Sequence, residues 1–293
     1  GRRTRLTLPN GVSTEYLYDV RSRLTELIYR NAASVLGNLT YQYDSAGNRT
    51  RVGGSFARIT LPAPVASATY DAANRQLHFG DSAMTFDPNG NLTSMSQGIE
   101  VTSFTWDGRN RLVAVTGPGG STEYRYDALG RRLVGPLGGA PAQWLHDRVN
   151  VIEGSGSAGT HTYLRTLAVD EVAVAALPEG PRFPIVDHRG STIGLTDMDG
   201  ALRTEFTYEA FGRSTPGGES SAFPFRFTGR EEDGNGLYHY RSRFYHPGFG
   251  RFLSEDPLGF DGGLNLYAYA LGNPVDLADP FGFWPTSIHD ELI

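Results

Sequence analysis

The chain has 293 residues, a formal net charge of −6 at pH 7 and no cysteine, which excludes a disulfide framework, a thiolate nucleophile and a thiolate metal site. All 26 basic residues are arginine, no basic run stands out and no run of about 20 apolar residues occurs, so neither nucleic-acid binding nor direct membrane insertion is expected. Glycine (37 residues) and aromatic residues (12%) are abundant, which favours many strands joined by turns.

An aromatic residue followed by an acidic one recurs along the chain. The pairs are Tyr18-Asp19, Tyr43-Asp44, Tyr70-Asp71, Phe86-Asp87, Trp106-Asp107, Tyr126-Asp127 and the variant Tyr208-Glu209. Two residues before each aromatic stands another apolar or aromatic side chain: Tyr16, Tyr41, Ala68, Met84, Phe104, Tyr124 and Phe206. Period two places both on one face of a strand, and the mostly polar residue between them on the other.

A short turn follows each of these acids. Aspartate accepts hydrogen bonds from the turn backbone two residues on, and Gly47 and Gly130 can take the left-handed conformation that closes a hairpin. Each repeat therefore predicts a strand, an aspartate-anchored turn and a second strand.

Residues 154–159 match the spacing of a dinucleotide-binding glycine fingerprint. That fingerprint requires a helix to follow, whereas residues 160–164 alternate as a strand, so we predict a hairpin loop. The seven histidines contain no pair four residues apart, and we expect no metal site and no cofactor. For His188 we expect a structural role.

Two copies of Asp-Pro-x-Gly, at Asp256 to Gly259 and at Asp279 to Gly282, end the patterned part of the chain. Aspartate first, proline second and glycine fourth favour a type I β-turn, which alone would account for both copies. Alternatively, the two carboxylates face one another. In that case one holds a proton while the other is charged, and such a pair can activate water.

The sequence resembles the YD-repeat or RHS (rearrangement hotspot) family, whose unit reads Tyr-x-Tyr-Asp-x-x-Gly-Arg/Asn. The resemblance continues through VDHRGSTIGLTDMDG (186–200), FTYEAFGR (206–213), FRFTGREEDGNGLYHYRSRFYHP (225–247) and the double Asp-Pro-x-Gly stretch, and covers residues 1–283. It implies an all-β fold of hairpins forming a large curled sheet, or shell, around a cavity closed by the RHS core. The implied parts are the repeat shell (1–222), the core with its cleavage motif (223–283) and the start of a C-terminal cargo (284–293).

The resemblance also implies self-cleavage by an aspartic-protease-like pair. Carried over by position, the pair is Asp256 and Asp279, and the cleaved bond is Phe283–Trp284. Arg251, just upstream in Gly-Arg-Phe, is a candidate to orient a carboxylate or the scissile carbonyl, and the alternative for it is a surface or wall salt bridge. The family usually has leucine where this chain has Phe283. Such a site would be a single-turnover protease and not a metabolic enzyme.

The function implied is the shell of a secreted or exported bacterial polymorphic toxin. It would encapsulate its own C-terminal toxin and release it by the cut after Phe283, with secretion-system or toxin-complex components as further partners. The chain opens within a strand pattern and without methionine, and we expect it to be part of a longer one.

Two other functions stay open. In a structural cell-surface or adhesion protein, such as the related animal teneurin shells, Asp256 and Asp279 would serve only their turns. A carbohydrate-binding repeat domain would need exposed aromatic residues on the convex side of the sheet. After residue 283 the repeat pattern stops, and Ser287 followed by His-Asp-Glu predicts the N-cap of a helix.

Overall fold

The computed structural model describes residues 2–137, 139–157 and 159–283, and the backbone of residues 286–287. These residues form the all-β fold that the sequence predicts. Their regular elements are short antiparallel strands and three 3₁₀ turns, η1 (Phe227–Gly229), η2 (Gly259–Gly262) and η3 (Ala270–Gly272). None of the described helical turns is long and apolar enough to cross a membrane.

Three meandering sheets contain the repeats, and in each of them neighbouring strands follow one another in chain order. The first sheet comprises β1 (Arg5–Thr7), β2 (Ser13–Tyr18), β3 (Leu24–Arg30), β4 (Val35–Tyr43) and β5 (Arg49–Gly53). The second comprises β6 (Ala68–Tyr70), β7 (Gln76–Phe79), β8 (Ser82–Phe86), β9 (Leu92–Gln97), β10 (Glu100–Trp106), β11 (Leu112–Gly117) and β12 (Gly120–Glu123).

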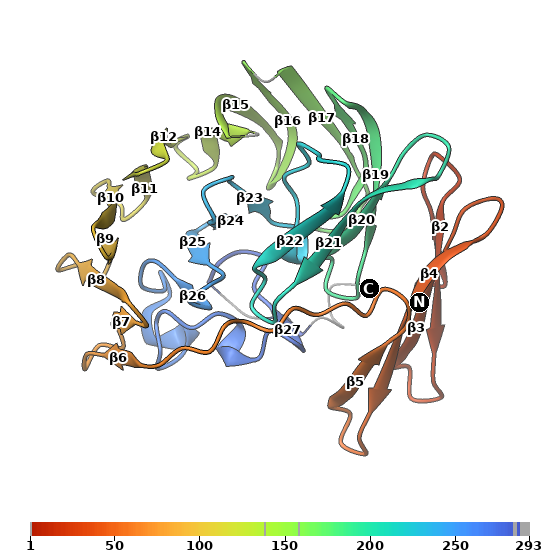
Figure 1. Ribbon diagram of the computed structural model, residues 1–293, viewed down its shortest axis with the longest axis horizontal. Helices are drawn as coiled ribbons and strands as arrows, with labels where there is room; N and C mark the ends of the chain where they lie inside the picture. The colour runs from red at the N-terminus through yellow and green to blue at the C-terminus, as the bar shows by residue number, and fades with distance from the viewer. Residues whose placement is uncertain (1, 138, 158, 284–285, 288–293) are drawn as a thin grey trace.

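The third sheet is the largest. It comprises β13 (Arg125–Tyr126), β14 (Arg132–Leu137), β15 (Ala140–Asp147), β16 (Asn150–Gly156), β17 (Gly159–Arg165), β18 (Val172–Leu177), β19 (Gly180–Val186), β20 (Thr192–Thr196), β21 (Leu202–Tyr208) and β22 (Ser214–Gly218). Figure 1 shows the second and third sheets following one another as a curved wall. Because β16 and β17 pair as a hairpin, the loop predicted within residues 154–159 is confirmed.

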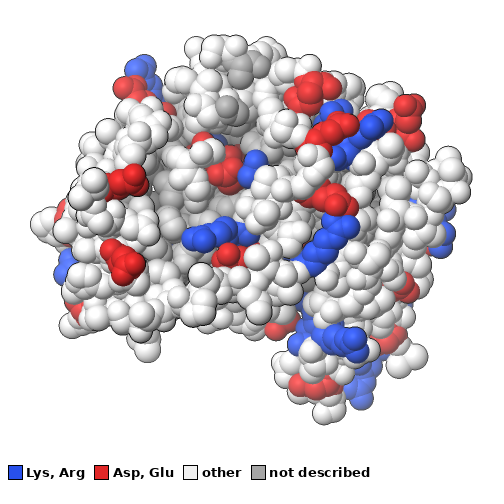
Figure 2. All heavy atoms as spheres, viewed as in Figure 1, with Lys and Arg blue, Asp and Glu red and all other residues white. Residues whose placement is uncertain are grey.

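A smaller sheet lies on the concave side of this wall (Figure 1). It comprises β23 (Glu231–Glu232), β24 (Tyr238–Tyr240), β25 (Arg243–His246) and β26 (Arg251–Phe252). We refer to residues 223–283, which contain this sheet, as the core segment. Figure 2 shows side chains of both charge signs spread over the face seen in Figure 1, without a large patch of one sign.

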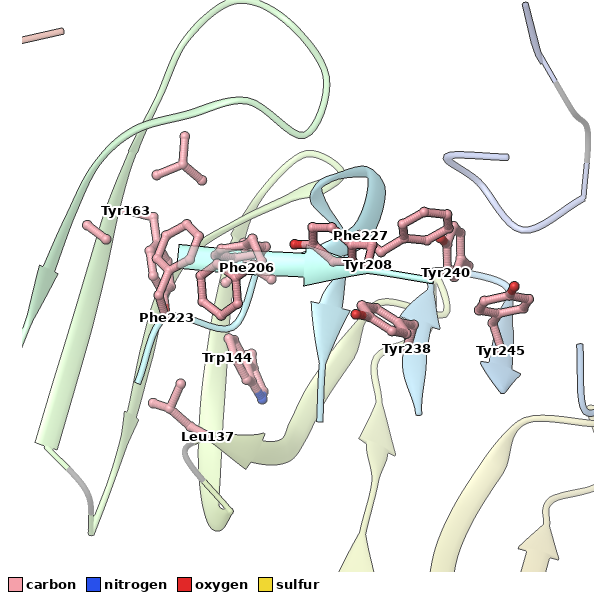
Figure 3. Close-up of a cluster of buried hydrophobic side chains, with 14 of the residues drawn as sticks. Leu137, Trp144, Tyr163, Phe206, Tyr208, Phe223, Phe227, Tyr238, Tyr240 and Tyr245 are labelled. Carbon is pink, nitrogen blue, oxygen red and sulfur yellow. The ribbon is translucent and has the colours of Figure 1, made fainter. Parts of the chain in front are cut away.

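Aromatic side chains fill the space between the wall and the core segment. Trp144 and Tyr163 of the wall share one buried cluster with Phe223 and Phe225. Figure 3 shows Trp144, Tyr163 and Phe223 gathered around Phe206. The rings of Tyr163 and Phe225 meet edge to face with centroids 4.8 Å apart. Such pairs contribute about 0.5–1.5 kcal/mol each beyond the area they bury. The aromatic stripe of the repeats therefore binds the core segment here.

The acid of each repeat closes its own turn, as predicted. At Asp127 the backbone N–H donates to the carbonyl of Arg131 (2.9 Å), and Oδ1 accepts the N–H groups of Leu129 and Arg131 (both 2.9 Å). The Arg131 side chain then pairs with Oδ2 at 2.7 Å. The residue three positions after the acid has positive φ, as at Gly130 (+83°) and Asn110 (+57°).

The aromatic residue before the acid joins one repeat to the previous one. Tyr126 Oη donates to the carbonyl of Leu112, and Trp106 Nε1 to that of Leu92, both at 2.7 Å. Each acceptor lies five residues after the acid of the preceding repeat. The side chains predicted on the buried face are buried or partly buried, except Ala68 and Tyr70, which are exposed because they belong to the edge strand β6.

The first sheet packs against strands β19 and β20 of the third. Leu27 and Tyr29 share a buried cluster with Ile185 and Ile193, and all five residues of β20 are buried. Tyr29 Oη donates to the carbonyl of Val186 at 2.7 Å. His188 is buried at the same contact, with Nδ1 3.1 Å from Tyr41 Oη, and takes the structural place expected of it.

At the end of the described chain, the backbone of Thr286–Ser287 forms β28, which pairs with β27 (Leu277–Ala278). The helix predicted to start at Ser287 falls on residues that lie outside the described ones. Trp284 and residues 288–293, which include most of the predicted cargo, lie outside the described residues.

Replacing a turn aspartate should weaken the wall locally. In Asp107→Ala, two backbone N–H groups and the Arg111 side chain lose their acceptor, and each such bond contributes about 0.5–1.5 kcal/mol net. We expect urea unfolding to show a loss of about 1–3 kcal/mol. Asp81→Ala, at an exposed aspartate in the β7–β8 turn, is the control and should change stability by less than about 0.5 kcal/mol.

The contribution of Asp107 to the free energy of unfolding should depend on pH. Burial alone would raise the pKa of Asp107, but hydrogen bonds from Arg111 and the turn backbone outweigh it, and the pKa is lowered. The folded state thus holds fewer protons than the unfolded state near the ordinary value of about 3.9, and stability is lost as the pH falls through the lowered folded pKa. We expect the difference between wild type and Asp107→Ala to be constant from about pH 7 to 5 and to shrink below about pH 4. A difference unchanged at about pH 3 would contradict this assignment.

Candidate active site

Both Asp-Pro-x-Gly segments are turns of the same design as the repeat turns. The N–H of Gly259 donates to the carbonyl of Asp256 (2.9 Å), and that of Gly282 to the carbonyl of Asp279 (3.3 Å). Gly259 and Gly282 have φ of +58° and +75°, as the residue three positions after the acid has in the repeats. The turn predicted from the residue pattern is therefore present at both places.

These two turns differ from the repeats at the fourth residue after the acid. Four repeat turns carry arginine there, and each of these arginines pairs with its own aspartate (Arg23, Arg75, Arg111 and Arg131). Phe260 and Phe283 occupy the matching positions after Asp256 and Asp279. Neither carboxylate therefore has an arginine from its own turn at that position.

A distant arginine, Arg243 at the start of β25, contacts both carboxylates instead. Its Nη2 lies 2.9 Å from Asp256 Oδ2 and 3.3 Å from Asp279 Oδ2. The two oxygens cannot be farther apart than the sum of these distances. The structure thus brings together the two carboxylates singled out in the sequence.

This three-residue group is buried. The exposed side-chain fractions are 2% for Arg243, 2% for Asp279 and 8% for Asp256. The guanidinium carbon of Arg243 lies 3.6 Å from the centroid of the Phe252 ring. Burial lowers the pKa of Arg243, although both carboxylates favour its charged form.

Two glycines make room for this arrangement. A Cβ on Gly262 would lie 2.7 Å from Asp256 Oδ2, and one on Gly282 would lie 2.2 Å from the carbonyl oxygen of Tyr240. Both distances are too short for any side chain. The backbone around the two carboxylates is therefore packed as closely as glycine permits.

The turn between β24 and β25 holds the chain immediately before the predicted cut. Three consecutive carbonyl groups accept hydrogen bonds from three consecutive residues: Pro280 from Arg241 Nη1, Phe281 from the N–H of Ser242 and Gly282 from Arg243 Nε. On the other side, Asp279 Oδ1 accepts the N–H groups of Gly282 (2.8 Å) and Phe283 (3.0 Å). Residues 279–283, which we call the cleavage segment, are thereby fixed at both edges.

Arg251 does not take the role predicted for it. Its Nη2 donates to the carbonyl of Asn74 (2.6 Å) and to Asn265 Oδ1 (2.9 Å), and its guanidinium lies over the Tyr70 ring. The contact expected of Arg251 is made by Arg243. No signal in the sequence separates the two arginines, because each precedes a phenylalanine in a short strand.

Among the described residues, no group of three or more histidine, aspartate and glutamate side chains could hold a metal ion. The groups that the site brings together are two carboxylates, one guanidinium and the peptide groups of the cleavage segment. A carboxylate pair at this spacing is suited to moving protons to and from a water and an amide.

Removing the shared arginine should destabilise the fold strongly. Arg243→Met leaves two buried carboxylates without their cation, and breaking a buried ion pair in this way costs about 3–5 kcal/mol. Adding Asp256→Asn and Asp279→Asn to Arg243→Met should recover part of that loss, because neutral amides need no counter-charge. The test is urea unfolding of the wild type, of Arg243→Met and of the triple variant that combines Arg243→Met with Asp256→Asn and Asp279→Asn. No recovery in the triple variant would contradict the proposed charge balance.

Several bacterial toxin proteins are similar in sequence to the chain. The toxin protein Tse5 of Pseudomonas aeruginosa is 30% identical over 92% of this chain and 25% of its own length, and double-stranded DNA deaminase toxin A of Burkholderia cenocepacia is 28% identical over 92% of this chain and 21% of its own. The chain thus spans a quarter or less of these relatives.

Solved structures share the fold. A TcdB2-TccC3-Cdc42 crystal structure superimposes with a TM-score of 0.68 at 21% identity, over 98% of this chain and 19% of that one. A Photorhabdus luminescens Tc holotoxin pore gives 0.66 at 22% identity, over 96% and 18%. The family model described as Teneurin YD-shell matches residues 4–275. The chain therefore belongs to the teneurin YD-shell family.

Proposed function

We propose that the chain is the shell-forming part of an exported bacterial polymorphic toxin and that it releases a C-terminal toxin by cutting itself after Phe283. The observation that carries the proposal is the convergence of Asp256 and Asp279 on Arg243, next to a segment that is held up to Phe283. The partners are then the chain's own C-terminal toxin as cargo and components of a secretion system or toxin complex. The toxin names of Tse5 and of deaminase toxin A support this assignment.

The reaction is hydrolysis of the Phe283–Trp284 peptide bond. One charged carboxylate takes a proton from water, and the resulting hydroxide attacks the carbonyl carbon of Phe283. The protonated carboxyl first hydrogen-bonds the carbonyl oxygen and then donates its proton to the nitrogen of Trp284 as the C–N bond breaks. The pair thus holds one proton before and after the reaction, and it titrates as a unit.

Arg243 sets a condition on this chemistry. Its Nη2 contacts both Oδ2 atoms, whereas the proposed hydrolysis needs a proton and a water at these oxygens. The active arrangement therefore requires one contact with Arg243 to give way to a proton and a water. A slow site suffices, because the substrate is part of the same chain and only one turnover is needed.

A structural cell-surface or adhesion protein that does not cut itself is the second candidate. The turn hydrogen bonds of Asp256 and Asp279 favour it, because they give both residues a role without catalysis. A carbohydrate-binding surface has less support. Among the described residues, the large apolar side chains that are exposed include only two aromatic ones, Tyr70 and Phe260.

Self-cleavage separates the two candidates. In the wild-type chain carrying a C-terminal tag, mass spectrometry should find a tagged fragment that begins at Trp284. Asp256→Asn and Asp279→Asn should each abolish this fragment, since each removes one acid–base group. Asp107→Asn is the matched control, because it changes a turn aspartate outside the site. This variant should still be cut after Phe283. An uncut wild type would favour the structural candidate.

A further inference from the structure

A second group of buried charges connects the wall to the core segment. Asp170 lies in the turn between β17 and β18 of the wall. Its Oδ1 accepts hydrogen bonds from Arg230 Nη1 and Arg241 Nη2, both at 2.6 Å, and its Oδ2 accepts one from Arg241 Nη1 at 3.1 Å. The exposed side-chain fractions are 10% for Asp170, 2% for Arg230 and 13% for Arg241.

Arg241 reaches from this group to the cleavage segment. Its Nη1 also donates to the carbonyl of Pro280, and its guanidinium carbon lies 4.9 Å from the centroid of the Phe281 ring. A single guanidinium therefore touches a wall carboxylate on one side and two residues of the cleavage segment on the other. Its neighbour Ser242 binds the next carbonyl, that of Phe281, at 3.2 Å.

The charges around Asp170 keep this connection in its ionic form. Burial by itself would raise the pKa of Asp170, but Arg230 and Arg241 outweigh burial, and the pKa is lowered. Glu231 pairs with Arg230, and the charge of Arg165 on the wall also acts on Asp170. Asp170 meets Arg230 and Arg241 only when the wall and the core segment are in contact, because Asp170 comes from the wall and both arginines come from the core segment.

We propose that Asp170 and Arg241 are positioning residues for the self-cleavage reaction. Through Arg241 the wall sets the place of the cleavage segment relative to Asp256 and Asp279, and the site is complete only after the core segment has docked in the wall. Cutting would then follow closure of the shell. The inference rests on the proposed self-cleavage, and a displacement of about 1 Å at such a site can cost about 100-fold in rate.

The chain offers a matched control. Arg132 of β14 and Asp233 of the core segment form another buried ion pair between the same two parts, with Nη1 2.7 and 2.6 Å from the two carboxylate oxygens and 1% of each side chain exposed. Among the described residues, the recorded hydrogen bonds and ion pairs of this pair do not involve the cleavage segment. A general loss of wall–core contact affects both groups, whereas a loss of positioning affects only the group at Asp170.

The test compares Asp170→Asn with Asp233→Asn. Stability is measured by urea unfolding in an Asp279→Asn background, so that cutting does not interfere. Cleavage is followed over time after dilution of the otherwise wild-type chain from denaturant. We expect Asp170→Asn to slow cleavage by about 100-fold. Asp233→Asn should change the rate by less than about 3-fold when the two are compared at equal stability, since its contacts lie away from the cut.

The place of the cut gives a second readout. A loosened segment should also be cut at neighbouring bonds. Mass spectrometry of Asp170→Asn should therefore find fragments that begin at residues next to Trp284 in addition to the fragment that begins at Trp284. If Asp170→Asn does not fold, Arg241→Lys replaces it. Lysine keeps the charge near Asp170 but cannot bind Asp170 and Pro280 with one planar group, and we expect at least about 10-fold slower cleavage.

The outcomes separate the two proposals. A wild type that cuts itself, with Asp170→Asn and Asp233→Asn slowed equally at matched stability, would overturn the positioning role and leave the proposed function standing. If Asp170→Asn cleaves itself at the wild-type rate and at a single site, the positioning role is also overturned and the proposed function still stands. An uncut wild type would overturn both proposals.

Discussion

The structure depends on one local interaction, the hydrogen bonding of an aspartate to the backbone of its own turn. It recurs along the three repeat sheets from Asp19 to Asp197, and each time it fixes the end of one strand and the start of the next. Because the contact spans only four residues, each hairpin costs little loop entropy to close. Where the aromatic residue before the acid is a donor such as Trp106 or Tyr126, it ties its hairpin to the previous one, and a long sheet results from short-range contacts.

The candidate site is a modification of this turn. Asp256 and Asp279 keep the backbone contacts, but phenylalanine replaces the arginine that would pair with the second carboxylate oxygen. That oxygen is then open to Arg243, which comes from another strand. The loss of one arginine per turn thus replaces a local ion pair with a long-range one, because the carboxylate now pairs with Arg243 of β25.

Buried ion pairs place the core segment in the wall. Arg132–Asp233 and Asp170–Arg241 each join one part to the other, and their members lie far apart in sequence. Desolvation makes such pairs poor sources of stability, but an unpaired member in the interior is costly. They therefore disfavour any docking of the core segment in which the partners do not meet. We attribute the register of the core segment to these pairs and the strength of its binding to the aromatic cluster.

The sequence predicted the features that depend on contacts between residues near in the chain. It did not predict the features that depend on contacts between residues far apart in the chain. Period two identified the buried face of the repeats, and the turn pattern located Asp256 and Asp279. Arg243 and Arg251 could not be distinguished, because both precede phenylalanine in similar strands and only the docking of β25 against the cleavage segment brings one of them to the carboxylates. The packing of the first sheet on β19 and β20 was missed for the same reason, since its contacts join residues more than 150 positions apart.

In the reaction that we propose, the two oxygens of each carboxylate have different roles, one in the turn and one in the chemistry. Oδ1 of Asp279 accepts two backbone N–H groups, and Oδ1 of Asp256 accepts the N–H of Leu258 at 2.9 Å, so these oxygens hold the turns. The Oδ2 atoms meet at Arg243, away from the turn backbone. A proton or a water can therefore replace a contact at Oδ2 while the turn stays intact. The turn role at Oδ1 is therefore compatible with the proposed catalysis at Oδ2.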